Sequence, residues 1–340
     1  MSVLAVRYTA PRSFTVTTMD DPRPGPGEVR VAVTIAGCCG TDLHIHDGGF
    51  FSSFPLTPGH EIIGEIESLG PGVDDLPLGT AVAVDNTVLC GRCPPCRRGV
   101  PLFCQDFHSL GVTDDGGFAR FVVAGASKCF PIDLRPGAAV MIEPLACAVH
   151  GLDVLALRPG ADVLLVGAGP TGLLLAQLLV HGGAARVTVA APTPYKLELA
   201  AHFGADETVV IGRGDLSGQQ ARLRALAPEG FDAVIEATGA PEILAATPAL
   251  VRDGGTILVY GMADAAATVA FHPYEIFRRE LTVKGSFAQV NCFDRAISYL
   301  QSGRIDVDGI VTNEYPLDRF ADALEAMRTD ASCLKAAIRP

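Results

Sequence analysis

The sequence predicts an α/β protein with two domains: a doubly wound parallel sheet, and a mostly β domain that carries a cysteine-rich lobe. Three observations predict this class. Short β segments separated by Gly and Pro fill the first 140 residues, continuously apolar strands alternate with helices from about residue 147, and four cysteines cluster within residues 90–104. A chain of 340 residues is long enough for about two hydrophobic cores.

The mostly β domain is predicted from short segments in which β-forming residues recur. These segments are residues 28–37, 61–70, 80–86 and 118–125. Turn residues separate them at short intervals, which is typical of an irregular, mostly antiparallel β domain.

The parallel sheet is predicted from strands that are apolar at nearly every position. We expect strands at residues 163–166, 186–190, 209–211, 233–236 and 256–260, and helices at 171–181 and 195–203. Strands of this kind are buried on both faces, so helices are expected to cover both sides of the sheet.

The last part of the chain has a mixed pattern. We expect helices at residues 293–302 and 317–328 and a final strand at 336–338. This segment is too short to form a domain, so we expect it to pack onto the first one. The predicted domains are therefore residues 1–146 with 282–340, which include the lobe at 90–104, and residues 147–281.

Composition and charge exclude several classes of protein. Hydrophobic residues make up 49% and charged residues 19%, which is typical of a globular protein. The 26 basic and 38 acidic residues leave a net charge of −12, which disfavours nucleic acid as a partner. No apolar run reaches the roughly 20 residues of a membrane span, and the N-terminus lacks the pattern of a signal peptide. We therefore expect a cytoplasmic protein with no membrane partner.

Three glycines follow the first strand of the predicted parallel sheet. They lie in Gly167-Ala-Gly169-Pro170-Thr171-Gly172, which has the spacing G-x-G-x-x-G between a strand and a helix. Gly167 would make the tight turn, Gly169 would let backbone N–H groups approach a pyrophosphate, and Gly172 would allow close helix–strand packing. The helix N-terminus attracts phosphate, so a dinucleotide site is expected. An ordinary glycine-rich turn is the alternative.

The end of the second strand bears on the choice of dinucleotide. An acidic residue there binds the ribose hydroxyls of NAD, but this strand ends at Ala191. Thr193 and Lys196 follow and could bind a 2′-phosphate, which favours NADP. No Arg follows the strand, so NAD bound through Thr193 or the backbone remains the alternative.

Four closely spaced cysteines predict a structural metal site. Cys90, Cys93, Cys96 and Cys104 lie within fifteen residues that include few apolar side chains. One short loop can then wrap a tetrahedral ion, as structural zinc sites do. Disulfides and an iron–sulfur cluster are the alternatives, and a reducing compartment disfavours the disulfides.

A second set of metal-binding side chains is spread along the first half of the chain. Cys39 offers a thiol, His60 an imidazole, and Glu61 and Glu143 offer carboxylates. A catalytic zinc takes about three protein ligands and keeps one position open. Taken alone, each of these residues would be interpreted as structural, such as a buried Cys or a core His. Their occurrence together with a dinucleotide site favours the interpretation as ligands of a catalytic zinc.

Several motifs together resemble the zinc-dependent alcohol dehydrogenases of the medium-chain dehydrogenase/reductase superfamily. They are Gly59-His-Glu-Ile-Ile-Gly64, Cys39-Gly-Thr-Asp, the four-cysteine lobe, Gly116-Gly-Phe-Ala119, the glycine motif, Glu236-Ala-Thr-Gly239 and Gly254-Gly-Thr-Ile-Leu-Val-Tyr-Gly261. The resemblance covers nearly the whole chain. Glu143-Pro-Leu is similar to the polyol (sorbitol, arabinitol) dehydrogenase branch. The resemblance implies a GroES-like catalytic domain, a Rossmann domain, two zinc ions per chain, and a homotetramer or homodimer.

The resemblance also implies roles for individual residues. Cys39, His60 and Glu61 would bind catalytic zinc, with Glu143 as a ligand or as a group that acts through water. Thr41 would pass a proton from the substrate oxygen toward His44, although His44 beside His46 could also be a surface histidine. A further pair, Thr238 and Gly239, would contact the cofactor. Cys147 is a possible competitor for metal.

The implied activity is hydride transfer between a secondary alcohol of a polyol or sugar-like substrate and NAD(P). Three departures limit this expectation. Gly79-Thr80-Ala81-Val82 lacks the usual acid and base of the family, the loop 288–291 lacks the Arg of sorbitol dehydrogenases, and Ala191 replaces an acid.

Other functions remain open at this stage. The substrate could carry a ring hydroxyl, as in a cyclitol, aminocyclitol or amino sugar. From a different class, the chain could be a catalytically inactive, zinc-stabilised nucleotide-binding protein, although the full set of candidate ligands argues against this. A zinc-free quinone reductase would need neither metal constellation.

Overall fold

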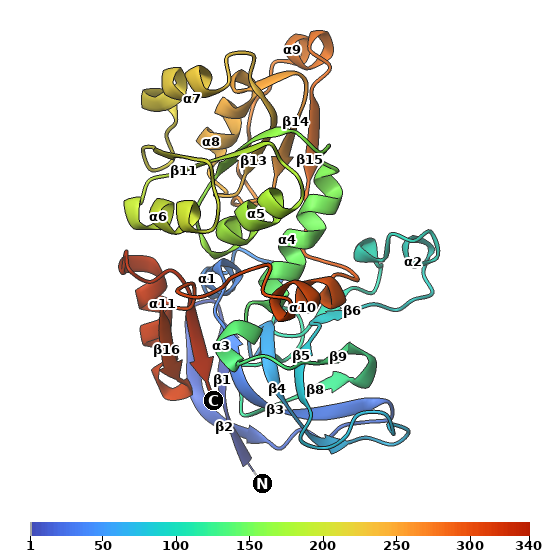
Figure 1. The fold of residues 1–340 in the computed structure, drawn as a ribbon. Coiled ribbons are helices and arrows are strands. Elements are labelled where there is room, and N and C mark those ends of the chain that lie inside the picture. The colour runs from blue at the N-terminus through green and yellow to red at the C-terminus, as the bar shows by residue number, and fades with distance from the viewer. Residues whose placement is uncertain (1) are drawn as a thin grey trace. The chain divides into compact units, whose positions relative to one another are not determined.

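The computed structural model describes residues 2–340, and the chain divides into two compact units (Figure 1). The first unit comprises Met1–Ala146, Val290–Gly303 and Val307–Pro340. The second comprises Cys147–Gln289 and Arg304–Asp306. The predicted α/β class, with one mostly β part and one parallel sheet, is confirmed.

The second unit extends further along the chain than the sequence pattern suggested. Residues 282–289, which the sequence pattern assigns to the first domain, lie in this unit. The reason is β15 (Thr282–Gly285), which pairs in parallel with β14 (Val251–Val259) and forms the edge of its sheet. β15 is mostly exposed, so it lacks the apolar pattern by which buried strands are recognised.

The first unit is built on a seven-stranded sheet. Its order is β16-β17-β3-β4-β5-β9, and β8 also pairs with β3. The strands of this sheet are β3 (Glu28–Gly37), β4 (Glu61–Leu69), β5 (Ala81–Val84), β8 (Phe121–Gly125), β9 (Cys129–Pro131), β16 (Asn313–Pro316) and β17 (Ala336–Arg339). β16 and β17 pair in parallel, and the other pairs are antiparallel. β1 (Ser2–Ala10) forms a hairpin with β2 (Ser13–Asp20), and β6 (Thr87–Val88) pairs with β7 (His108–Ser109).

Helices of the first unit are short. They are α1 (Gly40–Asp47), α2 (Pro94–Arg97), α3 (Pro136–Ala139), α10 (Phe293–Gln301), α11 (Phe320–Thr329), and the 3₁₀ turns Pro101–Phe103, Ala126–Lys128 and Leu317–Arg319. The apolar face of β3, including Val29 and Val31, packs in one core with Phe320 of α11 and Phe118. The C-terminal helix and strand are thus part of the first unit, as expected.

The second unit is a six-stranded parallel sheet of order β12-β11-β10-β13-β14-β15. The remaining strands are β10 (Asp162–Val166), β11 (Arg186–Ala191), β12 (Glu207–Val210) and β13 (Phe231–Glu236). Its helices are α5 (Pro170–His181), α6 (Pro194–His202), α7 (Gln220–Leu226), α8 (Pro241–Ala246) and α9 (Pro273–Arg278), with 3₁₀ turns at Ser217–Gln219 and Thr247–Ala249.

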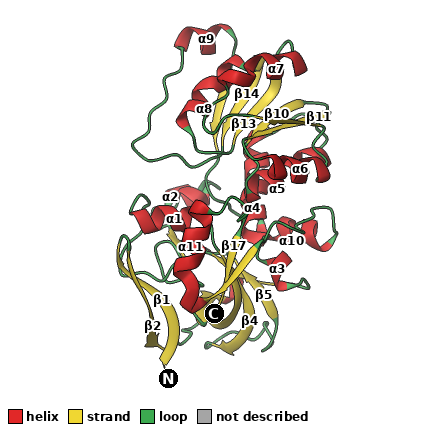
Figure 2. Ribbon diagram, turned by 90° about the vertical axis from the view of Figure 1, so that its left-hand side faces the viewer, coloured by secondary structure: helices red, strands yellow, loops and turns green. Residues whose placement is uncertain are grey.

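Helices cover both faces of this sheet (Figure 2). Leu164 and Val166 of β10 pack in one core with Leu223 of α7 and Ile243 of α8. Alternate residues of a strand point to opposite faces, so Val163 and Leu165 face the other side, where α5 and α6 lie. Strand order reverses beside β10, and ligands of such sheets bind at the carboxyl ends of the strands there.

One helical stretch is longer than the apolar runs expected from the sequence. By length and composition Pro136–Leu155, which includes α4 (Ile142–Leu155), could cross a membrane. However, 67% of its most apolar part is buried inside the protein. Its apolar side chains therefore belong to the protein core, and the stretch is weak evidence for a membrane partner.

Candidate active site

Cys39 lies where β3 turns into α1. It is the N-cap residue of α1, and its backbone N–H donates to Oδ2 of Asp42 at 2.8 Å. This contact satisfies an N–H group at the helix start and fixes the turn that carries the thiol. The preceding Cys38 is buried in the core and has a packing role.

His60 and Glu61 approach Cys39 because β3 and β4 are antiparallel. Glu61 is the first residue of β4 and pairs with Gly37, the last residue of β3. One ligand atom each from Cys39, His60 and Glu61 lies within 4.8 Å of the others. His60 and Glu61 are buried, with 5% and 1% of their surface exposed.

The charge around His60 is negative. Burial alone lowers the pKa of His60, but the charges of Asp42, Cys39 and Glu143 outweigh burial and raise this pKa well above its ordinary value. Oδ1 of Asp42 lies 3.8 Å from Nδ1 of His60. A buried cluster of this charge favours a cation.

The donors of this cluster fit a zinc ion. Thiolate, imidazole and carboxylate are the ligands of catalytic zinc sites. Nδ1 of His60 is buried and faces Oδ1 of Asp42 at 3.8 Å, and Oε2 of Glu61 is buried 2.6 Å from the Lys335 ammonium. One ligand atom from each of Cys39, His60 and Glu61 lies within 4.8 Å of the others, so the three residues fit a metal ion by donor type and by proximity.

Thr41 and His44 lie on α1, close to this cluster. The thiol of Cys39 donates to the Thr41 hydroxyl at 3.7 Å. His44 is three residues further and therefore lies on the same side of the helix as Thr41. His44 is half-buried. The structure thus brings Thr41 to the cluster and places His44 on the same helix.

Glu143 lies in the first turn of α4 and is mostly buried. Its charge acts on His60. Among the described residues, the compact ligand group contains Glu61 and not Glu143. Cys147 belongs to the second unit and is in neither cysteine-containing group of the described residues.

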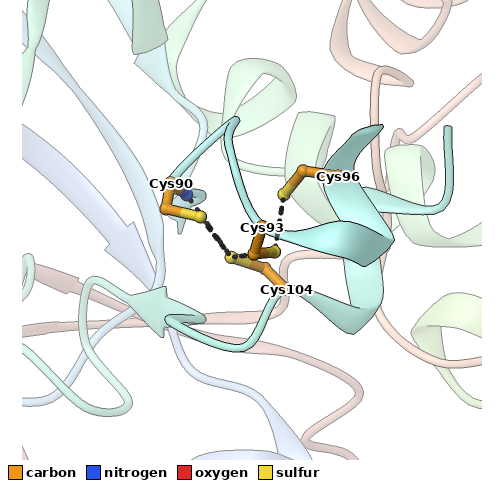
Figure 3. Close-up of side chains that lie close together, drawn as sticks. All are labelled: Cys90, Cys93, Cys96 and Cys104. Carbon is orange, nitrogen blue, oxygen red and sulfur yellow. Dashed lines mark hydrogen bonds between the residues drawn. The ribbon is translucent and has the colours of Figure 1, made fainter. Parts of the chain in front are cut away.

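The four-cysteine lobe forms a second compact group (Figure 3). The Sγ atoms of Cys93 and Cys96 are 3.5 Å apart, and Cys104 lies 3.5 Å from Cys90 and 3.8 Å from Cys93. Zn–S bonds of about 2.3 Å in a tetrahedron give S–S distances of about 3.8 Å. The sulfurs are too far apart for disulfides, and all four thiols are free.

Backbone N–H groups also prepare this lobe for a metal. The N–H groups of Cys96 and Gln105 lower the pKa of Cys93 to about 6. The N–H groups of Cys90 and Asp106 donate to Sγ of Cys104, each at 3.4 Å. Thiolates are the form that binds metal, so these contacts favour zinc binding.

The glycine motif of the second unit has the geometry of a dinucleotide site. Gly167 has a φ of 120°, which favours glycine, and a Cβ on Gly172 would lie 2.1 Å from the Gly167 carbonyl oxygen. A Cβ on Gly169, the N-cap residue of α5, would meet nothing within 4 Å. The backbone there is open, next to the N–H groups of Thr171 and Gly172 in the first turn of α5; Pro170 at the helix start has no N–H.

Thr238 and Gly239 follow β13 beside this turn. A Cβ on Gly167 would lie 3.2 Å from Cγ2 of Thr238. The carboxylate of Glu236 accepts hydrogen bonds from the N–H groups of Thr238 and Gly239 at 2.6 and 3.0 Å, and from the Thr238 hydroxyl. Glu236 therefore holds the loop that closes this end of the sheet.

The residues proposed to contact the adenosine ribose of the cofactor lie at the end of β11 and directly after it. Ala191 ends the strand and is buried, and Thr193 is the N-cap residue of α6. Lys196 lies in the first turn of α6, with its ammonium 5.8 Å from the centre of the Tyr195 ring.

Two residues at the metal cluster were not predicted from the sequence. Asp42 could have been found, because an acid three residues after Cys39 matches a helix cap. Lys335 forms an ion pair with Glu61, at 2.6 Å, from the other end of the chain. The one signal for Lys335 is its position as a lone charge in the apolar segment before the C-terminus.

Comparison with known proteins agrees with both units. Residues 25–134 match the alcohol dehydrogenase GroES-like domain, and residues 170–302 match the zinc-binding dehydrogenase family. The chain belongs to the zinc-dependent alcohol dehydrogenase family, in its polyol dehydrogenase-like branch. It is an oxidoreductase that uses zinc and NAD(P).

Individual relatives cover nearly the full chain. D-arabinitol dehydrogenase 1 of Uromyces fabae is 46% identical over 338 residues, or 99% of this chain and 97% of that protein. D-altritol 5-dehydrogenase of Agrobacterium fabrum is 34% identical, covering 91% of each. A zinc-binding dehydrogenase of Sinorhizobium meliloti, solved with NADP bound, is 33% identical with a TM-score of 0.94 over 100% of both chains.

Proposed function

We propose that this protein oxidises a secondary hydroxyl of an acyclic polyol, or reduces the matching ketone, with NADP as the preferred cofactor. The observation that carries the proposal is the compact group of Cys39, His60 and Glu61 beside Thr41. The polyol substrate is supported by the 46% identity to a D-arabinitol dehydrogenase.

Cys39, His60 and Glu61 would hold the catalytic zinc, with Glu143 nearby as a group that acts through water or as a further ligand. Zinc in such a site polarises a substrate oxygen and makes its hydroxyl more acidic. Cys90, Cys93, Cys96 and Cys104 would hold the structural zinc.

Thr41 and His44 are proposed to carry the proton of the reacting hydroxyl. Thr41 contacts Cys39, so its hydroxyl is close enough to accept a hydrogen bond from a substrate held at the cluster. His44, one helical turn further along α1, would then exchange that proton with solvent. Asp42 would orient His60, since their side chains face each other at 3.8 Å.

The second unit would supply the dinucleotide site. Gly167, Gly169, Pro170, Thr171 and Gly172 would bind the pyrophosphate, and Thr238 and Gly239 would line the nicotinamide end. Ala191 in place of an acid removes a charge that would repel a 2′-phosphate, and Thr193 and Lys196 offer donors for it. Relatives have been solved with NADP and with NADH, so the preference rests on these residues after β11.

We also propose a cytoplasmic homodimer or homotetramer. Cys39 and the four cysteines of the lobe form no disulfide, which fits a reducing compartment. β15 lies at the open edge of the parallel sheet, and Val283 on it and Phe277 on α9 are 41% and 80% exposed. Sedimentation of the purified protein would give the subunit number.

The test of the activity is a spectroscopic assay for reduced cofactor with NAD and NADP in parallel. Substrates should include arabinitol, sorbitol, altritol, cyclitols, amino sugars, and L-threonine, because relatives 32–34% identical are L-threonine 3-dehydrogenases. We expect turnover of acyclic polyols that is faster with NADP and is lost in Cys39→Ala. Turnover of ring hydroxyls or threonine alone would contradict the proposed substrate, and faster turnover with NAD would contradict the cofactor preference.

A further inference from the structure

Lys335 is a charged residue in an otherwise apolar part of the first unit. Only 4% of its surface is exposed. Its ammonium lies 2.8 Å from Oε1 and 2.6 Å from Oε2 of Glu61, and 3.1 Å from the carbonyl oxygen of Cys38. A buried ammonium is costly unless it is paired and hydrogen-bonded, so this position calls for an explanation.

The C-terminal strand places Lys335 at the metal cluster. β17 begins at the next residue and pairs with the end of β3, with Ala337 opposite Gly37. The N–H group of Cys38 donates to the Ala336 carbonyl at 2.9 Å. The segment therefore contacts both the turn that carries Cys39 and the carboxylate of Glu61.

The Glu61 carboxylate is held on two sides. Lys335 donates a hydrogen bond to Oε1 and forms an ion pair with Oε2 at 2.6 Å. Gly37 leaves the room for it, because a Cβ there would lie 1.8 Å from Oε2. A carboxylate has about four lone-pair sites, so the contact with Lys335 leaves lone pairs available for a metal.

Lys335 also balances charge. The Cys39 thiolate and the carboxylates of Asp42, Glu61 and Glu143 can place four negative charges around His60. A divalent ion offsets two of them. The Lys335 ammonium offsets one more, which matters in a site shielded from water.

We propose that Lys335 is a positioning residue that anchors the Glu61 carboxylate beside Cys39 and His60 and thereby sets the affinity of this site for zinc. The inference rests on the proposed function, since it takes these three residues as the zinc ligands. It extends the site to a residue 274 positions along the chain from Glu61.

The test is competition for zinc between a chelator and the intact protein, with the four-cysteine site as an internal standard. Lys335→Met has a side chain of similar length without the charge. We expect it to bind zinc at the Cys39–His60 site about 10–100-fold more weakly, as when outer partners of ligands are removed. Lys335→Arg, which keeps the charge, should restore most of the affinity.

A double-mutant cycle separates this role from a merely structural one. If Lys335 acts through Glu61, Glu61→Gln and Lys335→Met are non-additive, and the double variant binds zinc no more weakly than Glu61→Gln. Additive losses, or unchanged zinc affinity in folded Lys335→Met, would overturn the proposal. Should Lys335→Met not fold, Gly37→Ala displaces the carboxylate while both charges remain, and it should lose zinc to the same extent; unchanged affinity there would also overturn the proposal.

Arg339→Met is the matched control. Arg339 lies on the same C-terminal strand and pairs with the half-exposed Glu314 at 2.5 Å, and neither residue belongs to the group of Cys39, His60 and Glu61. The loss of Arg339 should leave zinc affinity unchanged. Cys39→Ala separates a failure of the proposed function from a failure of the role of Lys335. If Cys39→Ala still binds zinc at His60 and Glu61, the proposed function is wrong. If Cys39→Ala loses this zinc while Lys335→Met keeps it, only the role of Lys335 is wrong.

Discussion

Asp42 is a single residue with two contacts at the metal cluster, and its two oxygens can be tested separately. Oδ2 accepts the Cys39 N–H, and Oδ1 faces Nδ1 of His60. Asp42→Asn keeps an acceptor for Cys39 but removes the charge near His60. We expect about 10–100-fold weaker zinc binding and a similar loss of kcat/KM, measured by chelator competition and steady-state kinetics.

Asp47→Asn on the same helix is the control for this prediction. Asp47 is 40% exposed and pairs with Arg12 and Arg328 at the far end of α1. Its substitution should leave zinc affinity within about two-fold of wild type, as for a surface ion pair. If Asp42→Asn and Asp47→Asn lowered zinc affinity equally, the effect would come from a general disturbance of α1, and the charge of Asp42 near His60 would have no specific role.

Glu236 is expected to make stability depend on pH. Burial raises the pKa of Glu236, against the opposing effect of hydrogen bonds from Thr238, Gly239 and Ala240. A raised pKa means that the folded state binds the proton more tightly. The stabilisation is complete below the unfolded pKa of about 4.3 and is lost as pH rises through the higher folded value.

The variant Glu236→Gln has a similar shape and no charge at any pH. We therefore expect the melting temperature of wild type minus that of Glu236→Gln to fall as pH rises from about 4 toward 7. Thermal denaturation of both proteins without cofactor, in matched buffers, measures this difference. A difference that rises with pH would mean that the hydrogen bonds outweigh burial.

At the residue scale, candidate ligands were identified by residue type and by resemblance to a family. The structure brings Cys39, His60 and Glu61 within 4.8 Å of one another through the pairing of β3 with β4, and their binding of zinc stays a prediction. Lys335 was not found, because its role depends on a strand pairing between the two ends of the chain. No local pattern around residue 335 contains that information.

At the scale of elements, the four-cysteine lobe should depend on its metal. Its helix α2 has four residues, and its side chains form little apolar core. Cys96→Ser should therefore lose one zinc ion per chain and loosen the lobe, since structural zinc supplies folding energy. Limited trypsin digestion should cut after Arg97 and Arg98 at least about ten-fold faster, with the sites identified by mass spectrometry.

Cys147→Ser is the control for the lobe, because Cys147 lies outside both described metal groups. It should retain two zinc ions and the wild-type digestion pattern. A full zinc content in Cys96→Ser would contradict the assignment of the lobe as a zinc site.

Strands and helices with a regular pattern of apolar residues were predicted closely. Exposed strands, and segments that pair with a different strand from the one expected, were not. The strand at 28–37 and the helix at 293–302 agree with β3 and α10 to within a residue. The strand expected at 118–125 begins only at Phe121, because Phe118 and Ala119 contact β1 instead. The edge strand β15 was missed, since mostly exposed strands carry a weak apolar signal.

At the scale of the whole molecule, each unit has its own hydrophobic core and its own proposed ligand. The cores contain different residues, and the metal clusters lie in the first unit while the glycine motif lies in the second. The two-domain division was predictable from the change in strand pattern near residue 147. The end of the second unit near residue 289 was not predictable, because it depends on the pairing of β15 with β14 in the parallel sheet.

The separate ligands predict separate effects on thermal unfolding. A ligand that binds only the folded state at 100 times its Kd stabilises by about 2.7 kcal/mol, or about 5–10 °C for a domain of 150–250 residues. NADP should therefore raise the melting temperature of the second unit by about this amount, and chelation should lower that of the first. Differential scanning calorimetry, combined with hydrogen exchange to assign each transition, measures both. If NADP and chelator shift one common transition, the two units unfold as a single cooperative structure and their stabilities are coupled.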